Sequence, residues 1–146
     1  MGQVTSARRQ AREVALQALY AWQLSGGDPL EQARELEGFG KRDAALVEAI
    51  LRGVLSRAAE LEALIARHLD REFRRLSPVE RAILYIGAYE LLSQPDTPFK
   101  VVIDEAVELG KAYGGTGGYK YVNGVLQKLA LELRAAETAR CLQNSS

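Results

Sequence analysis

The chain has 146 residues, of which 47% are hydrophobic, and its 19 basic and 19 acidic side chains cancel to a formal net charge of zero. This length allows one ordinary domain or two very small ones with a packed core, and the balanced charge excludes a polycation that coats nucleic acid indiscriminately. No apolar run reaches the roughly 18 residues of a membrane span, and the arginine-bearing start lacks a signal peptide's apolar segment. Because the single cysteine, Cys141, also fits a reducing compartment, we expect a cytoplasmic protein.

The first predicted helix covers residues 6–24 and carries Arg8, Arg9 and Arg12 near its start. A helix N-terminus already has about half a positive charge, so arginines there are unfavourably placed unless an anion binds to them. Arg8 and Arg12 are one turn apart on one face, with Arg9 beside them, whereas an alanine-rich stripe that ends at Trp22 is expected to be buried. The pattern predicts three arginines accessible to phosphate groups, and a merely solvated face is the alternative.

Capping residues and prolines mark the starts of later helices. Residues 28–31 and 77–80 each place an N-cap residue before a proline and a glutamate at the capping-box position, and residues 97–98 repeat the cap and proline without the glutamate. Apolar residues recur at three- and four-residue steps and no stretch alternates as a strand, so we predict an all-α protein. The seven predicted helices cover residues 6–24, 29–37, 43–67, 69–75, 78–92, 98–113 and 119–136.

The densely charged segment 67–77 separates two groups of about three helices each. We expect an N-terminal bundle over residues 1–68 and a C-terminal bundle over 69–136, packed as one compact unit because each half alone has a marginal core. Residues 137–146 are expected to form a polar tail. The glycine-rich loop 114–118 lacks the lysine-serine or lysine-threonine pair of a phosphate-binding loop.

A second candidate site follows this loop, at the predicted start of the last long helix. Tyrosine can stack on an unpaired base, lysine can neutralise a phosphate, and an asparagine amide can bond to a base edge, which makes Lys120, Tyr121 and Asn123 candidates for RNA contacts. Taken alone, Tyr121 also fits a core aromatic and Asn123 a cap or an interhelical hydrogen bond. The RNA interpretation gains weight if this segment lies beside the arginines.

Catalytic and metal-binding interpretations are weaker. Asp104 and Glu108 could form an acid and base pair, but acids near a helix start with Lys111 following are typical of a solvated face. The one histidine, His68, has no cysteine or second histidine nearby, which argues against a metal site or a nucleophilic triad. We therefore predict neither an enzyme nor a cofactor.

Four stretches in the same order resemble the NusB family of bacterial transcription antitermination factors. They are residues 8–13 with 18–24, 79–84 with 88–91, 98–111, and 120–126. The resemblance spans nearly the whole chain, with two departures. The loop 114–118 replaces a more polar, acid-containing loop, so contacts made there by relatives do not transfer, and the tail after about Leu133 matches nothing in the family.

The resemblance implies two perpendicular three-helix bundles and a non-enzymatic role in transcription of ribosomal RNA operons. The factor would bind single-stranded boxA RNA together with the ribosomal protein NusE, and with other Nus factors help RNA polymerase pass terminators. By position, the arginines at 8, 9 and 12 and residues 120, 121 and 123 belong to RNA-facing segments. Tyr20 and Glu80 match positions on the NusE side, although Glu80 is also explained as a capping-box residue.

We expect modest affinity for RNA alone, improved by the partner, and a fold that survives removal of the three arginines. Two alternatives remain. One is an RNA-independent protein-interaction module, such as a homodimer, whose arginines bind an acidic protein surface. The other is an enzyme domain, since similar helical domains are fused to RNA methyltransferases, but no Rossmann-like strand pattern or glycine motif supports it.

Overall fold

The computed structural model describes residues 7–36, 43–115 and 117–144. Residue 6, the first of the helix predicted over 6–24, and residue 37, the last of the helix predicted over 29–37, lie outside the described residues. Every regular element in these ranges is helical, which confirms the predicted all-α class. None of these helices combines the length and the apolar character needed to cross a membrane. The elements are α1 (Ala7–Ser25), α2 (Pro29–Arg34), α3 (Ala44–Ala66), the 3-10 helix η2 (Phe73–Arg75), α4 (Pro78–Ser93), α5 (Phe99–Tyr113), α6 (Gly118–Leu133) and α7 (Ala135–Asn144).

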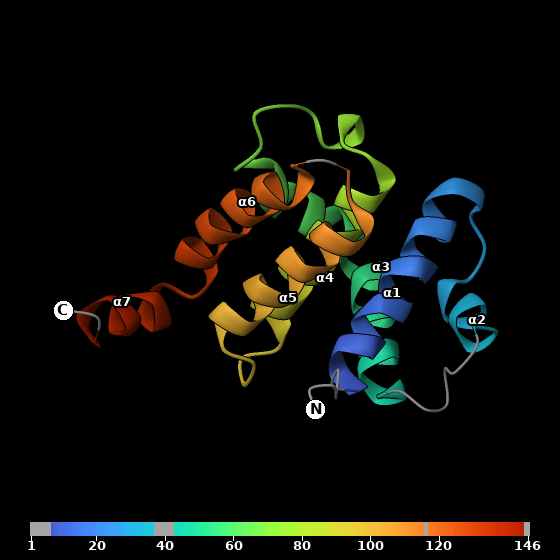
Figure 1. Cartoon of the computed structure of the whole chain (residues 1–146), viewed down its shortest axis with the longest axis horizontal. Coiled ribbons are helices and arrows are strands. Elements are labelled where there is room, and N and C mark those ends of the chain that lie inside the picture. Colours follow the sequence, from blue (N-terminus) through green and yellow to red (C-terminus); the bar gives the residue numbers. More distant parts are fainter. Residues whose placement is uncertain (1–6, 37–42, 116, 145–146) are drawn as a thin grey trace.

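Helix α4 lies at the centre of the fold and contacts α1, α3, α5 and α6 (Figure 1). Its residues 82–91 are all buried, as expected for a helix that neighbours surround on every side. Helices α1, α2 and α3 contact one another, and α4, α5 and α6 do the same. Helix α4 is therefore in contact with helices of both sets, while α7 extends from the end of α6.

The helix starts follow the capping signals in part. Asp28 caps α2, but it accepts a hydrogen bond from the backbone N–H of Leu30 and not from that of Glu31, as the predicted capping box requires. The predicted capping box at the start of α4 is present. The cap predicted at residues 97–98 is wrong, because α5 begins after Pro98 without a side-chain cap of its own. Instead, Glu137 of α7 accepts a hydrogen bond of 2.8 Å from the N–H of Phe99. A side chain 38 residues away therefore caps α5.

Three other predicted elements differ from the structure. The helix predicted over 29–37 ends at Arg34, with Glu35 as its C-cap. The helix predicted over 69–75 is only the 3-10 helix η2, which has no side-chain cap and is followed by extended backbone at Leu76. The helix predicted over 119–136 ends at Leu133. Arg134 leaves the helical conformation, with φ −125° and ψ 42°, and the predicted polar tail is helical as α7.

Candidate nucleic-acid interface

The start of α1 presents two of its three arginines at the surface. Arg8 is exposed, and its guanidinium lies 3.5 Å from the carboxylate of Asp43 at the start of α3. Arg9 is half-buried and forms a bidentate pair with Glu105 of α5, with hydrogen bonds of 3.0 and 2.7 Å. The charge that the sequence places at this helix end is thus met by carboxylates within the chain.

The third arginine of this group is part of the core. Arg12 is 3% exposed and donates two hydrogen bonds of 2.8 Å to the carboxylate of Glu90, which is 1% exposed. Glu105 lies 3.7 Å from the same guanidinium. The expectation that all three arginines are accessible is therefore wrong for Arg12. Arg8 and Arg12 share a face of α1, but one turn after Arg8 this face is covered by α4.

The pKa values reflect this pairing. Burial alone would lower the pKa of Arg12, but the hydrogen bonds and charge of Glu90 outweigh burial and raise it. The pKa of Glu105 is lowered, chiefly by the hydrogen bonds from Arg9, although its partial burial opposes the shift. Both groups therefore stay charged at neutral pH and hold the start of α1 against α4 and α5.

The second predicted segment lies at the start of α6. Gly117 precedes this helix with a φ of +79°, a conformation that favours glycine. Lys120 is exposed, whereas Tyr121 is half-buried and its hydroxyl donates a hydrogen bond of 2.8 Å to Asp70. Burial, followed by this bond, raises the pKa of Tyr121. Asn123 is half-buried, and its side-chain oxygen lies 3.4 Å from the amide nitrogen of Gln127.

The two segments lie at different levels of α5. The arginine cluster contacts α5 at Glu105, whereas the start of α6 packs over Gly110, where a Cβ atom would lie 2.8 Å from the Cβ of Tyr119. The intervening residues of α5 correspond to roughly 8 Å at 1.5 Å per residue. In Figure 1, α1 begins at the lower edge of the molecule and α6 near the upper edge. They are therefore linked across α5 and do not form one compact patch.

This arrangement depends on the close approach of α6 to α5 at Gly110. We expect Gly110→Ala to lower the free energy of unfolding by about 1–3 kcal/mol, because the new methyl group would meet the backbone of Tyr119 at 2.9 Å. Gly124→Ala is the matched control, since a Cβ at that helical glycine meets nothing within 4 Å. It should instead stabilise the protein by up to about 1 kcal/mol. Urea unfolding checks both, and equal effects of the two substitutions would contradict the packing argument.

Tyr20 and Glu80 are the two residues predicted to contact a protein partner, and both are neighbours of Val79 of α4. Tyr20 is 41% exposed and lines an apolar pocket of about 210 Å³ with Leu16, Gln17, Val79 and Tyr113. Glu80, next to Val79, completes the capping box of α4 and reaches toward Gly118. The sequence did not single out Tyr113, although an exposed tyrosine at the end of an amphipathic helix was a usable signal.

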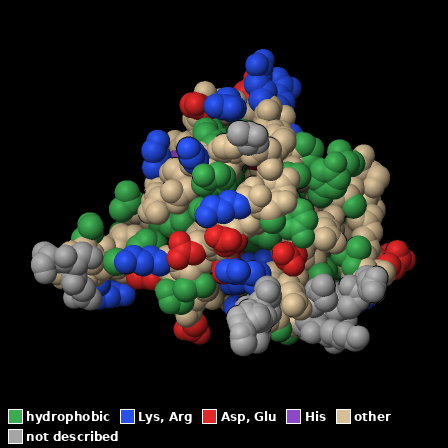
Figure 2. Space-filling view, viewed as in Figure 1, with side chains coloured by type: hydrophobic (Ala, Val, Ile, Leu, Met, Phe, Trp, Pro, Cys, Tyr) green, Lys and Arg blue, Asp and Glu red, His purple; other side chains and the backbone are tan. Residues whose placement is uncertain are grey.

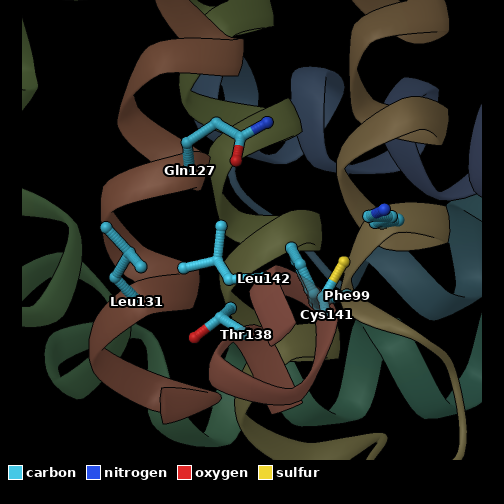
Figure 3. Close-up of a pocket in the computed structure, with 7 residues that line it drawn as sticks. Phe99, Gln127, Leu131, Thr138, Cys141 and Leu142 are labelled. Atoms are coloured by element: carbon cyan, nitrogen blue, oxygen red, sulfur yellow. The ribbon is translucent and has the colours of Figure 1, made fainter. Parts of the chain in front are cut away.

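Another groove lies between α5, α6 and α7. It has a volume of about 290 Å³, and Figure 3 shows Phe99, Leu131 and Leu142 converging on it from these three helices. Across the middle of the face in Figure 2, Lys and Arg side chains are interleaved with Asp and Glu. Within the described residues, no group of three or more His, Cys, Asp or Glu side chains is arranged to hold a metal ion.

Residues 9–131 match the sequence model of the NusB family. The chain belongs to the NusB family. Transcription antitermination protein NusB from Burkholderia mallei, Burkholderia pseudomallei and Burkholderia thailandensis is 54% identical to it over 136 residues, which cover 91% of this chain and 94% of each relative.

Solved NusB structures have the same fold. The chain superposes on T. maritima NusB with a TM-score of 0.78 and 34% identity, covering 86% of this chain and 91% of that one. A chain from the crystal structure of the antitermination factors NusB and NusE in complex with dsRNA gives a TM-score of 0.77 and 29% identity, covering 86% and 97%. The family match includes Arg9, Arg12 and the start of α6, but it ends before Arg134 and α7.

Proposed function

We propose that this NusB-family protein acts in transcription antitermination by binding boxA-like single-stranded RNA together with ribosomal protein NusE. The family match over residues 9–131 carries the proposal, since the similar relatives are transcription antitermination proteins and a solved relative is in a complex with NusE and dsRNA. The complex would join other Nus factors and RNA polymerase in the cytoplasm. The role is recognition and assembly without bond-making chemistry.

The geometry supports distinct roles for the candidate residues. Arg8 and Arg9 are placed to pair with phosphate oxygens through their guanidinium forks, and Lys120 supplies a further exposed charge beyond α5. The carboxylates that already neutralise Arg8 and Arg9 would compete with phosphates, which is consistent with modest affinity for RNA alone. Because Arg12 is buried, we propose that it positions the other two arginines.

The remaining candidate residues are assigned to reading RNA bases and to binding NusE. Tyr121 and Asn123 are half-buried at the start of α6, so each offers an edge to RNA while bonding within the protein. The pocket lined by Tyr20 and Val79, together with the neighbouring Glu80, is the proposed contact for NusE. A bound partner would add charge and contacts to the RNA site, which explains why the pair should bind more tightly than either protein.

Removing the two surface arginines tests the RNA site. We expect Arg8→Ala/Arg9→Ala to weaken binding of boxA RNA by about tenfold or more, as for the loss of at least one charge-assisted hydrogen bond, while leaving the fold intact. Lys128→Ala/Arg140→Ala is the control, because it removes two exposed cations from α6 and α7. Fluorescence anisotropy with boxA and scrambled RNA, with and without NusE and at several salt concentrations, measures the effect.

Two results would contradict the proposal. Equal binding of boxA and scrambled RNA under all conditions would exclude specific recognition. Unchanged RNA binding by Arg8→Ala/Arg9→Ala, together with weaker self-association in sedimentation, would favour an RNA-independent homodimer.

A further inference from the structure

The connector between α3 and α4 carries arginines that the proposed site does not use. Arg74 and Arg75 are the most exposed of these, with side chains 80% and 72% accessible. They share a single carboxylate, that of Glu72, at 2.9 and 3.5 Å. Ion pairs this exposed contribute little and exchange readily for another anion. The connector therefore presents positive charge that its own acids do not fully neutralise.

The middle of the connector, at Asp70 and Arg71, packs against the start of α6. The guanidinium of Arg71 lies 4.6 Å from the centre of the Tyr121 ring, and Asp70 bonds to the Tyr121 hydroxyl through both its carboxylate and its backbone N–H. At the other end of the connector, Arg67 and His68 pair with Glu132 of α6. The connector therefore lies along α6, with Asp70 and Arg71 against Tyr121, the residue after Lys120, and with Arg67 and His68 against Glu132 near the other end of the helix.

The figures agree with these contacts. Figure 1 draws the connector at the upper edge of the molecule, above the start of α6. A group of Lys and Arg side chains stands at the same edge in Figure 2. An RNA strand that crosses α5 from the arginines of α1 to Lys120 would reach the connector next, at Asp70 and Arg71 beside Tyr121.

We infer that Arg74 and Arg75 bind the phosphates of RNA that flanks the boxA-like segment on one side, with Arg71 as a positioning residue stacked on Tyr121. This inference rests on the proposed function and extends its site beyond Lys120. A guanidinium fork can pair with two phosphate oxygens, and two adjacent forks on an exposed turn match successive phosphates of a flexible strand. The contacts are with the backbone, so the flank need not have a defined sequence.

The test compares three RNAs on the full-length protein: the boxA-like segment alone, and the same segment with about ten added nucleotides on its 5′ side or its 3′ side. The variant is Arg74→Ala/Arg75→Ala. Its matched control is Arg34→Ala/Arg52→Ala, because Arg34 and Arg52 are also exposed and also share one carboxylate, that of Glu48, at 3.7 Å each.

We expect one extended RNA to bind the wild type more tightly than the core RNA does, and Arg74→Ala/Arg75→Ala to abolish this gain without changing core binding. Each lost contact should reduce the slope of log K against log salt for that RNA by about 0.7, so two contacts give about 1.4. The control variant should keep both the gain and the slope.

Three outcomes would overturn the inference. The first is that neither extension adds affinity, or that Arg74→Ala/Arg75→Ala behaves like its control, while the core RNA still binds. The second is weaker binding of NusE by this variant with unchanged RNA binding, which would assign the connector to an acidic protein surface. The third is absence of core binding by the wild type, which would overturn the proposed function as well.

Discussion

Replacing Arg12 with alanine is expected to lower the free energy of unfolding by about 3–5 kcal/mol. The reason is that the carboxylate of Glu90, which is 1% exposed, would lose both of its hydrogen bonds from the guanidinium and remain as an uncompensated buried charge. Arg8→Ala, by contrast, removes only a surface ion pair and should change stability by less than about 0.5 kcal/mol. Urea unfolding of the two variants measures the difference.

A double substitution separates the buried pair from simple loss of packing. Arg12→Met/Glu90→Leu replaces both charges with apolar groups and should cost much less than Arg12→Ala, since no charge is left unpaired. Two results would show that the buried pair does not hold α1 against α4. One is an Arg12→Ala variant within about 1 kcal/mol of the wild type. The other is a double variant whose loss in free energy of unfolding equals the sum of the losses for Arg12→Met and Glu90→Leu alone. Our expectation that the fold survives removal of all three arginines therefore applies only to Arg8 and Arg9.

A similarly large effect is expected at Arg134. This residue is buried and donates to four backbone carbonyls, those of Glu90, Leu91, Gln94 and Thr97, and it also pairs with Glu137 at 2.6 Å. Arg134→Ala leaves the last carbonyls of α4 without these donors and releases the carboxylate that caps α5. We expect a loss of about 3 kcal/mol or more in urea unfolding.

Substitutions at Glu137 isolate the capping part of this effect. Glu137→Gln keeps an oxygen that can accept from the N–H of Phe99, whereas Glu137→Ala removes it and should cost about 0.5–2 kcal/mol, as loss of an N-cap does. Glu137→Gln should therefore be the milder change. Equal effects of the two substitutions, or an Arg134→Ala variant as stable as the wild type, would contradict the role assigned to α7.

The features that the sequence predicted well are those set by neighbouring residues. The capping box of α4 lies within four consecutive residues, and the apolar spacing along α3 and α6 fixed their type and approximate bounds. The short segment 69–75 was mistaken for an α-helix because its charged residues have no strong bias against one. Its actual shape depends on side-chain contacts with α4 and α6, such as those of Phe73 and Asp70.

The features that the sequence missed depend on distant partners. Glu90 is an isolated acid in the apolar run of α4, and such a residue predicts a buried cation without telling which one. Glu105 likewise lies one helical turn from the buried Val102, at the edge of the apolar stripe of α5, but it stands between Asp104 and Glu108, which we interpreted as part of a solvated face. Only the packing of α1 against α4 and α5 shows that these two acids meet Arg12 and Arg9.

The position of Arg134 and α7 outside the family match has a consequence for exchanging parts between relatives. Residues 9–131 are the part of the chain that matches the family model, but the N-terminal end of α5 and the C-terminal end of α4 are completed by residues beyond it. A chimera that transplants the shared region onto another relative's tail, or a truncation at its boundary, would lose these donors and acceptors. A chimera should therefore take residues 9–131 and the segment with Arg134 and α7 from the same parent protein.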